Sequence, residues 1–245
     1  MIILSAGLPK SGSAWYFHMT NDMVRAAGFH DANEVKEQFN LHTILKFDTC
    51  NIQEPTPEKL QLLIAPPLNE YTFTVKTHFP PDSTLLDYMA RGRIKATFIY
   101  RDPRDIAVSG YEAGEKLRQR GIKNRFAKLT SMKNAIYWAE EWLKRSWEKW
   151  KPVEGVLFVR YEDLIEHSTK ELKRLCEFMD FHVETETLER IFDRWSASKM
   201  KSEPQQMLHF NKGSAGRYRT VMSPEELELC SERLGSYIEE MGYTV

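Results

Sequence analysis

The chain is poor in cysteine and has no long hydrophobic run. Its three cysteines, Cys50, Cys176 and Cys230, lie far apart among 245 residues and form no C-x-x-C pair. Such a set excludes a disulfide framework and favours reduced thiols in a cytosolic protein. No apolar run approaches the roughly 18 residues of a membrane-spanning helix, and the apolar start Met1–Gly7 is too short for a signal peptide. We therefore expect a cytoplasmic protein with no membrane partner.

No single sign of charge dominates the chain either. It carries 34 Lys and Arg against 35 Asp and Glu, a net charge of −1, whereas nucleic-acid binding usually leaves a strong basic excess. We therefore expect no nucleic-acid partner. The segment Glu112–Lys133 is a local exception, with seven basic and two acidic residues. It is either a solvated helix and loop or a mobile cover over an anionic ligand.

What is present is an alternation of strand-like and helix-like segments. Four short runs rich in Ile, Val, Phe and Tyr predict strands over Ile2–Ala6, Tyr71–Lys76, Lys95–Tyr100 and Gly155–Arg160. Helical patterns cover Ala14–Ala27 and Asn134–Trp150, and Asn51–Lys59 resembles a connection. Two further helices should begin at a capping box of Ser168 and Glu171 and at the N-cap Ser223.

This alternation decides the fold class. Strands separated by helices need crossover connections, which predicts an α/β fold with a mostly parallel central sheet flanked by helices. Ligands of such sheets bind at the carboxyl ends of the strands. The length fits one large domain as well as two small ones. The loops that follow the predicted strands should therefore hold the functional site.

The loop after the first predicted strand has the composition of a phosphate-binding turn. Backbone N–H groups of a Gly- and Ser-rich turn before a helix point at one spot that suits a phosphate. Gly7 and Gly12 have the spacing of the P-loop pattern G-x-x-x-x-G-K-[ST], but Ser13 stands where its lysine belongs. A lysine is present earlier, at Lys10. The loop either holds a phosphate without the usual ATPase lysine or is an ordinary tight turn.

Two further strand ends carry polar side chains. His78 follows the second predicted strand, where a neutral imidazole suits a general base, although a lone histidine is more often structural. Arg101 ends the third strand and would face Ser109 across about two turns if a helix begins near Asp102. An arginine with a hydroxyl can clamp a phosphate oxygen. The alternative is local pairing of Arg101 and Arg104 with the neighbouring aspartates.

The last two signals are ambiguous when taken alone. Tyr161 follows the fourth predicted strand, where it is either a core residue or faces the same crevice. The glycine-spaced segment Asn211–Arg217 contains Lys212 and Gly213. It could wrap a second phosphate or form a solvated turn.

In their order along the chain these pieces resemble the cytosolic-type sulfotransferase family. The resemblance rests on the loop Pro9–Trp15, Lys76-Thr77-His78, the segment Arg101–Ser109, the run Arg160–Asp163 and Lys212-Gly213. It spans roughly residues 1–220 and implies one domain over 1–245 with a P-loop-like three-layer fold. It also implies the donor 3′-phosphoadenosine 5′-phosphosulfate (PAPS), which leaves as adenosine 3′,5′-bisphosphate (PAP).

The same resemblance implies roles for individual residues. His78 would take the acceptor's proton, Lys10 would stabilise the leaving oxygen, and Lys76 would add positive charge near the transferring group. The donor's 5′ side and its adenine would be bound by Pro9, Lys10, Ser11, Gly12, Ser13, Ala14 and Trp15. The 3′-phosphate would be bound by Arg101, Ser109, Lys212 and Gly213. Tyr161 would lie at the adenine edge. No metal is implied, because in-line sulfuryl transfer needs positioning and charge stabilisation.

The sequence departs from the family pattern at several positions. Ser13 and Ala14 replace a pair of threonines, and Asn211 replaces an arginine before Lys212-Gly213. The stretch Ser196–Met200 lacks the aromatic residue that the family usually has before such a methionine, so adenine stacking falls to Trp15, with help from Trp195. The segment after Gly216 is shorter than the family's dimer segment, so the oligomeric state is left open.

The acceptor is expected to be a small hydroxyl compound, aromatic or apolar in character. Its pocket would be built by Tyr16, Phe17, the Phe79 region, Tyr111 and Glu112–Lys133, although aromatic side chains in loops also pack as core. Two alternatives to the sulfotransferase stay open. One is a P-loop nucleotide or small-molecule kinase, and the other is a non-catalytic nucleotide-binding protein.

Overall fold

The computed structural model describes residues 1–196 and 214–245. The described residues form a six-stranded sheet in the order β2-β3-β4-β1-β5-β6. Neighbouring strands are parallel, except for the antiparallel pair β2 and β3. The strands are β1 (Ile2–Gly7), β2 (Leu45–Lys46), β3 (Asn51–Ile52), β4 (Phe73–Thr77), β5 (Ile94–Tyr100) and β6 (Val156–Arg160). The predicted α/β fold with a mostly parallel sheet is confirmed.

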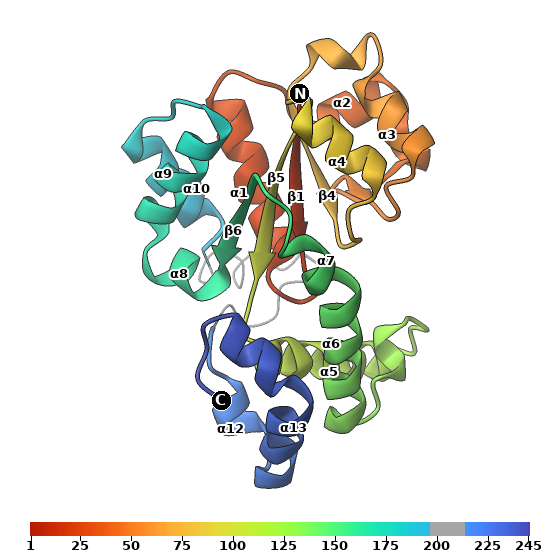
Figure 1. Cartoon of the computed structure of the whole chain (residues 1–245), viewed down its shortest axis with the longest axis vertical. Helices are drawn as coiled ribbons and strands as arrows, with labels where there is room; N and C mark the ends of the chain where they lie inside the picture. Colours follow the sequence, from red (N-terminus) through yellow and green to blue (C-terminus); the bar gives the residue numbers. More distant parts are fainter. Residues whose placement is uncertain (197–213) are drawn as a thin grey trace.

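Helices cover both faces of this sheet (Figure 1). Alternation along β1 sends Ile2, Leu4 and Ala6 into one buried cluster and Ile3 into the other. The cluster around Ile3 packs against α1 (Ser13–Ala26), α9 (Ser168–Met179) and α10 (Thr185–Arg194). The other cluster is covered by α2 (Ala32–Gln38), α3 (Pro57–Ile64), α4 (Ser83–Ala90) and α7 (Glu148–Trp150).

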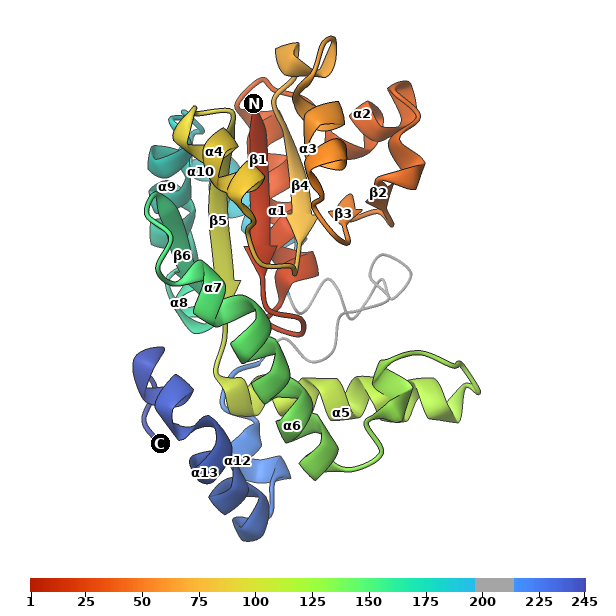
Figure 2. The same cartoon turned by 45° about the vertical axis from the view of Figure 1, so that its right-hand side comes forward.

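A group of helices lies beyond the carboxyl ends of the strands (Figures 1 and 2). Helix α5 (Pro103–Gln119) begins as the sequence predicted, with Asp102 as N-cap accepting from the Arg104 amide and Pro103 in the first turn. It packs against α6 (Met132–Trp142) and α13 (Pro224–Glu240). Short helices α8 (Tyr161–Glu166) and α12 (Tyr218–Val221) flank this region. These elements close the end of the sheet where the site was expected.

Several details differ from the sequence predictions. The segment predicted as one helix over Asn134–Trp150 contains a π-helical turn over Leu143–Trp147 between α6 and α7. The connection predicted at Asn51–Lys59 instead contains β3 and the start of α3. The strand predicted from Gly155 begins at Val156, because Gly155 has a φ of 73°.

The predicted capping box at Ser168 is wrong, whereas the predicted N-cap at Ser223 is confirmed. Helix α9 follows α8 almost directly, so Ser168 is already helical and His167 is the N-cap, without a side-chain cap bond. The Glu171 carboxylate accepts instead from Arg174. Ser223 caps α13 and exchanges bonds with Glu226 in a complete capping box.

The described part of the chain lacks two kinds of feature. No helix within residues 1–196 and 214–245 is long and apolar enough to cross a membrane. Over the same residues, no three His, Cys, Asp or Glu side chains are grouped as a metal site.

Candidate functional site

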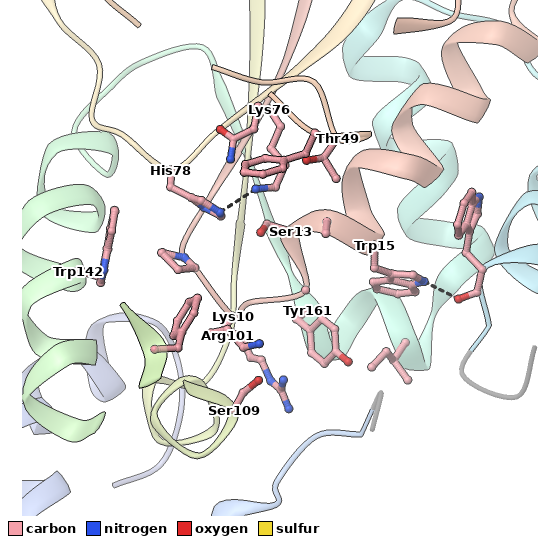
Figure 3. A pocket seen from close by; sticks show the side chains of 18 of the residues that line it. Lys10, Ser13, Trp15, Thr49, Lys76, His78, Arg101, Ser109, Trp142 and Tyr161 are labelled. Atoms are coloured by element: carbon pink, nitrogen blue, oxygen red, sulfur yellow. Dashed lines mark hydrogen bonds between the residues drawn. The ribbon is translucent and has the colours of Figure 1, made fainter. Parts of the chain in front are cut away.

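A cavity of about 810 Å³ lies at the carboxyl ends of the parallel strands. Its wall joins segments that are far apart in the chain: the loop between β1 and α1, the end of β4, the start of α5, the turn after α5 and the hairpin between β2 and β3. Figure 3 shows Lys10, Arg101, Ser109 and Tyr161 gathered on one side of it and Lys76, His78 and Thr49 on the other. The sequence-predicted residues that line it are Pro9, Lys10, Gly12, Ser13, Ala14, Trp15, Lys76, His78, Arg101, Ser109 and Tyr161.

The loop between β1 and α1 is held in a conformation with few alternatives. Gly12 has a φ of 85°, and a Cβ there would lie 2.7 Å from the Tyr161 ring. Lys10 has a φ of 69°, in the left-handed region that a residue with a side chain rarely adopts. Such backbone outliers cost of order 1–3 kcal/mol and cluster at functional sites. The loop therefore keeps a backbone conformation that serves the cavity at a cost in stability.

Lys10 and Lys76 are cations placed in a buried, positively charged site. Burial, helped by nearby Lys116 and Arg101, lowers the pKa of Lys10 to about 8. Burial also lowers the pKa of Lys76 to about 7, with Arg125 acting in the same direction and Asp48 against it. An anion in the cavity would raise both pKa values again, because it favours the charged amines.

His78 is fixed between a main-chain carbonyl and Lys76. Its Nδ1 lies 2.7 Å from the Gly7 carbonyl oxygen, and its Nε2 lies 2.7 Å from Lys76 Nζ (Figure 3). A carbonyl can only accept, so Nδ1 carries a proton. In the neutral ring, Nε2 is then the acceptor and Lys76 the donor. The Phe79 carbonyl accepts from Trp150 Nε1 at 2.9 Å, which holds the chain just after His78.

Arg101 connects the cavity to the C-terminal segment. Its guanidinium donates to Asp105 at 2.8 Å and to the Ser214 carbonyl at 2.6 Å, and it lies 4.4 Å from the centre of the Tyr161 ring. Asp105 also accepts from the amides of Gly216 and Tyr218. The local pairing considered for Arg101 is thus present, yet the side chain still lines the cavity. Its Nε is buried with no hydrogen-bond partner within the described residues, which leaves a donor for a ligand.

Arg104 behaves differently from Arg101. Its guanidinium binds Asp102 through two hydrogen bonds, donates to the Thr244 carbonyl and lies 4.0 Å from the centre of the Tyr218 ring. It does not line the cavity. Arg104 is therefore a structural residue, as the local-pairing alternative predicted for it.

The remaining predicted residues take different positions. The Ser11 hydroxyl donates to the Leu8 carbonyl at 2.7 Å and does not line the cavity. Trp15 lines it, and its indole N–H donates to the Trp195 carbonyl at 2.7 Å (Figure 3). The Trp195 ring is stacked on His18 at 4.7 Å, so one of its faces is occupied. Lys212 and Gly213 lie outside the described residues.

The sequence analysis missed Arg217 and the wall of the cavity that the β2–β3 hairpin forms. Arg217 lines the cavity and forms two hydrogen bonds with the Glu112 carboxylate. The hairpin between β2 and β3 contributes Phe47, Thr49, Asn51 and Gln53. The fully buried Cys50 and Ile52 lie between these residues, but strands of two residues are too short to show a period in the sequence.

Part of the expected acceptor pocket is wrong. Tyr16 and Phe17 are fully buried in the core, and neither they nor Tyr111 line the cavity. Phe79 does line it, and so do Asn124, Arg125 and Phe126 from the basic segment Glu112–Lys133, together with Trp142. The first part of this basic segment, up to Gln119, belongs to α5, and its cavity-lining residues follow in the turn after that helix.

The residues on the side of Lys10 and Arg101 fit a phosphate-rich nucleotide. Lys10 and Arg101 supply positive charge, the buried Arg101 Nε is an unused donor, and a Gly12 Cβ would fill the cradle against Tyr161. Ser109 adds a hydroxyl beside Arg101 (Figure 3). Cations and unpaired donors that converge without a carboxylate filling the space are typical of an anion site.

Comparisons with known proteins agree with this geometry. The chain matches the family model of the sulfotransferase domain over residues 2–242. It is 26% identical over 205 residues to sulfotransferase 1A1 of Mus musculus and 27% identical over 208 residues to sulfotransferase 1E1 of Homo sapiens. Both alignments cover 82% of this chain and 67% of the relative.

Two solved structures share the fold. A retinol dehydratase in complex with androsterone and the inactive cofactor PAP aligns with a TM-score of 0.61 at 18% identity, covering 100% of this chain and 82% of that one. Mouse sulfotransferase SULT7A1 complexed with PAP aligns with a TM-score of 0.59 at 21% identity, covering 97% and 84%. Since the family model spans nearly the whole chain and the fold agrees, the chain belongs to the sulfotransferase domain family and is a sulfotransferase.

Proposed function

We propose that this sulfotransferase moves a sulfuryl group from PAPS to a hydroxyl of a small acceptor, with His78 as general base. The observation that carries the proposal is that one cavity joins two kinds of group. A cationic loop around Lys10 and Arg101 forms one side, and a histidine with a fixed tautomer lies on the other. The first suits the donor and its departing nucleotide. The second suits a hydroxyl that must lose its proton.

The donor would lie along the loop between β1 and α1. Pro9, Lys10, Gly12, Ser13 and Ala14 line the cavity there and would surround the 5′-phosphosulfate. Ser11 would act through the loop, since its hydroxyl bonds the backbone. The adenine would lie against Trp15 and Tyr161, whose rings are 5.7 Å apart and nearly perpendicular.

The 3′-phosphate would bind where Arg101 and Ser109 meet. Lys212 and Gly213 are proposed to join them on the strength of the family resemblance alone. Two neighbouring structures hold PAP, which supports a nucleotide with this phosphate pattern as the common ligand of the fold.

The chemistry requires one proton transfer and one substitution at sulfur. PAPS supplies an activated sulfuryl group whose leaving group is a phosphate oxygen. His78 Nε2 accepts the hydroxyl proton while the acceptor oxygen bonds to sulfur and the bond from sulfur to the bridging oxygen breaks. The Lys10 ammonium stabilises the negative charge that develops on that oxygen. Charge stabilisation by lysine and proton removal by histidine complete this scheme without a metal.

Lys76 has a double role in this scheme. Its Nζ now bonds the lone pair of His78 Nε2, which is the atom that must take the proton. When Lys76 turns its ammonium toward the sulfuryl oxygens, that lone pair becomes available. The charged transferring group would thus prepare the base as well as bind the lysine.

Calorimetry with PAP, 5′-AMP and ATP tests the donor, and transfer of labelled sulfuryl from PAPS to a panel of phenols and alcohols tests the reaction. We expect PAP to bind most tightly and label to appear on a hydroxyl compound. Preferential binding of ATP would favour the kinase alternative, for which the Ser13 position gives little support. Tight PAP binding by a protein that transfers no label would favour a non-catalytic nucleotide-binding protein. The cytoplasmic location stays a prediction.

A further inference from the structure

Arg125 differs from the other arginines of the cavity. It lies in the turn after α5, and its guanidinium lies 5.1 Å from the centre of the Phe126 ring and 5.6 Å from that of Trp142. Arg101 is paired with Asp105 and Arg217 with Glu112. No carboxylate of the described residues pairs with Arg125. The Arg125 guanidinium thus lines the cavity beside aromatic rings, with no carboxylate of the described residues as its ion-pair partner.

Arg125 is an exposed residue that lines the cavity, so a ligand there can reach its guanidinium. Partial desolvation lowers the pKa of Arg125, and the neighbouring Arg145 lowers it further. Arg125 is the charged group that acts most on Lys76, but only a minor one among those that act on Lys10. The Trp142 ring beside Arg125 also lies 6.2 Å from the His78 ring, which places Arg125 near the Lys76 and His78 side of the cavity. On the other side of Arg125, Lys10 Nζ lies 5.4 Å from the Phe126 ring. An anion beside Arg125 would compensate its charge.

The hairpin wall of the cavity is polar as well. Thr49, Asn51 and Gln53 line the cavity from one edge of the sheet. Asn51 Oδ1 is buried and makes no hydrogen bond within residues 1–196 and 214–245. Buried polar atoms usually have a hydrogen-bond partner, either a protein group or water. The hairpin therefore gives this side of the cavity a polar wall.

Aromatic rings complete this side. Phe79, Phe126 and Trp142 line the cavity, and Phe47 lies at its rim with 62% of its surface exposed. These rings can pack on a flat or apolar body. The combination is an apolar surface with a single unpaired guanidinium.

We infer that the acceptor of this enzyme is a hydroxyl compound that also carries an anionic group, and that Arg125 determines this specificity by binding it. The inference rests on the proposed function, because it assigns Arg125 to the acceptor of the proposed transfer. The anionic group is a carboxylate, sulfate or phosphate on an aromatic or apolar body. Its charge-assisted bonds to the guanidinium would be stronger than bonds between neutral groups.

A matched pair of probes tests the inference: 4-hydroxyphenylacetate and its neutral amide, 4-hydroxyphenylacetamide. Their affinities are measured by calorimetry with PAP present. The wild type should bind the acid about ten- to a hundredfold more tightly than the amide. Arg125→Gln should remove this preference and leave PAP affinity within about twofold.

Arg145→Gln is the matched control. Arg145 lies 5.4 Å from the same Trp142 ring and 4.7 Å from Phe79, but it does not line the cavity. This variant should keep most of the preference for the acid, which separates a direct contact from a general change in charge.

Three sets of results would overturn the inference. One is a wild type without preference for the acid, whether both probes bind equally or neither binds. The second is an Arg125→Gln variant that keeps the preference for the acid. The third is a variant whose PAP affinity falls as much as its affinity for the acid, because Arg125 would then bind the nucleotide. Failure of the proposed function is visible separately, as a wild type that binds no PAP. The acid and amide are then compared without nucleotide, and the same preference decides the role of Arg125.

Discussion

The two sides of the cavity are built in different ways. The donor side comes from short segments that directly follow β1, β5 and β6, and its arginine Arg101 is tied to Asp105 and the Ser214 carbonyl. The acceptor side comes from the β2–β3 hairpin and the turn after α5, where Arg125 lies against the Phe126 and Trp142 rings and pairs with no carboxylate of the described residues. One side is fixed by the central sheet, and the other is added at its margin.

This difference separates two tasks. Groups on strand ends are held by the register of the sheet, so their spacing changes little when surface segments change. Groups on an edge hairpin and a turn can change without disturbing the sheet. The donor side should therefore be shared among proteins of this fold, while the acceptor side sets the individual substrate. The predictions below test whether the two sides can be perturbed separately.

The largest effect is expected at His78, where the two sides meet. His78→Gln and His78→Ala should lose about 10²–10⁴ in turnover, because the hydroxyl keeps its proton. PAP affinity should stay near the wild-type value, since in the proposed scheme the imidazole contacts the acceptor and not the nucleotide. Turnover and PAP affinity are measured on the same preparations, together with melting temperature. A variant that melts early and binds PAP poorly would show that His78 serves the fold.

Lys10 tests the donor side. Lys10→Ala should lower turnover by about 10²–10³, the usual cost of removing one preorganised charge contact. Lys10→Gly is the matched variant, because glycine adopts the φ of 69° at this position without strain. Both should be equally inactive, while the glycine variant should melt at a higher temperature. Near-normal sulfuryl transfer by either would remove Lys10 from the mechanism.

Arg101 and Arg104 provide a comparison within one helix start. Arg101→Gln should reduce the preference for PAP over 5′-AMP by about 1.5–3 kcal/mol, the value of a charge-assisted hydrogen bond. Arg104→Gln should lower stability, since it leaves Asp102 without its partner, and should keep the preference. Calorimetry with both nucleotides gives the preference. If the two variants change it equally, the 3′-phosphate site is not where we place it.

The smallest expected effect is a dependence of PAP binding on pH. Burial lowers the pKa of Lys10 to about 8 in the free protein, so the amine is charged below that pH and neutral above it. A bound polyanion favours the charged form, so binding above pH 8 takes up a proton. PAP affinity should fall by up to about tenfold per pH unit from pH 8 to 9. Calorimetry in two buffers of different ionisation enthalpy reveals the proton, and Lys10→Ala should reduce the uptake to the share of Lys76, whose pKa an anion also raises.

The donor side was largely predictable from the sequence, because its signals are local. A glycine pair before a helix and Arg101 one residue before an Asp-Pro helix start each fall within a short window. The same holds for Lys76 and His78 at the strand end where the two sides meet. The acceptor side was not predictable. Strands of two residues such as β2 and β3 are too short to show a period, and Phe47 and Cys50 turn the hairpin with positive φ values of 62° and 41° that no glycine announces.

Other errors have the same origin in long-range structure. Tyr16 and Phe17 resembled pocket residues because they follow the phosphate-type loop, but α1 directs both into the core. The pairing of Arg217 with Glu112 joins residues 105 positions apart, which a single sequence cannot show. A single domain over 1–245 stays a prediction, although one sheet carries both faces of the core.

The bond from His78 Nδ1 to the Gly7 carbonyl has an evolutionary consequence. Where a carboxylate orients a histidine, one substitution can remove the orienting group. Here the orienting oxygen belongs to the main chain, and its place follows from the parallel alignment of β1 with β4, in which Ala6 lies opposite Thr77. Replacement of Gly7 is itself restricted, because a Cβ there would lie 2.7 Å from the Ile99 carbonyl. The orientation of the histidine is therefore robust to point mutation. Substitutions in the surrounding side chains can change the substrate specificity while the orientation of His78 stays the same.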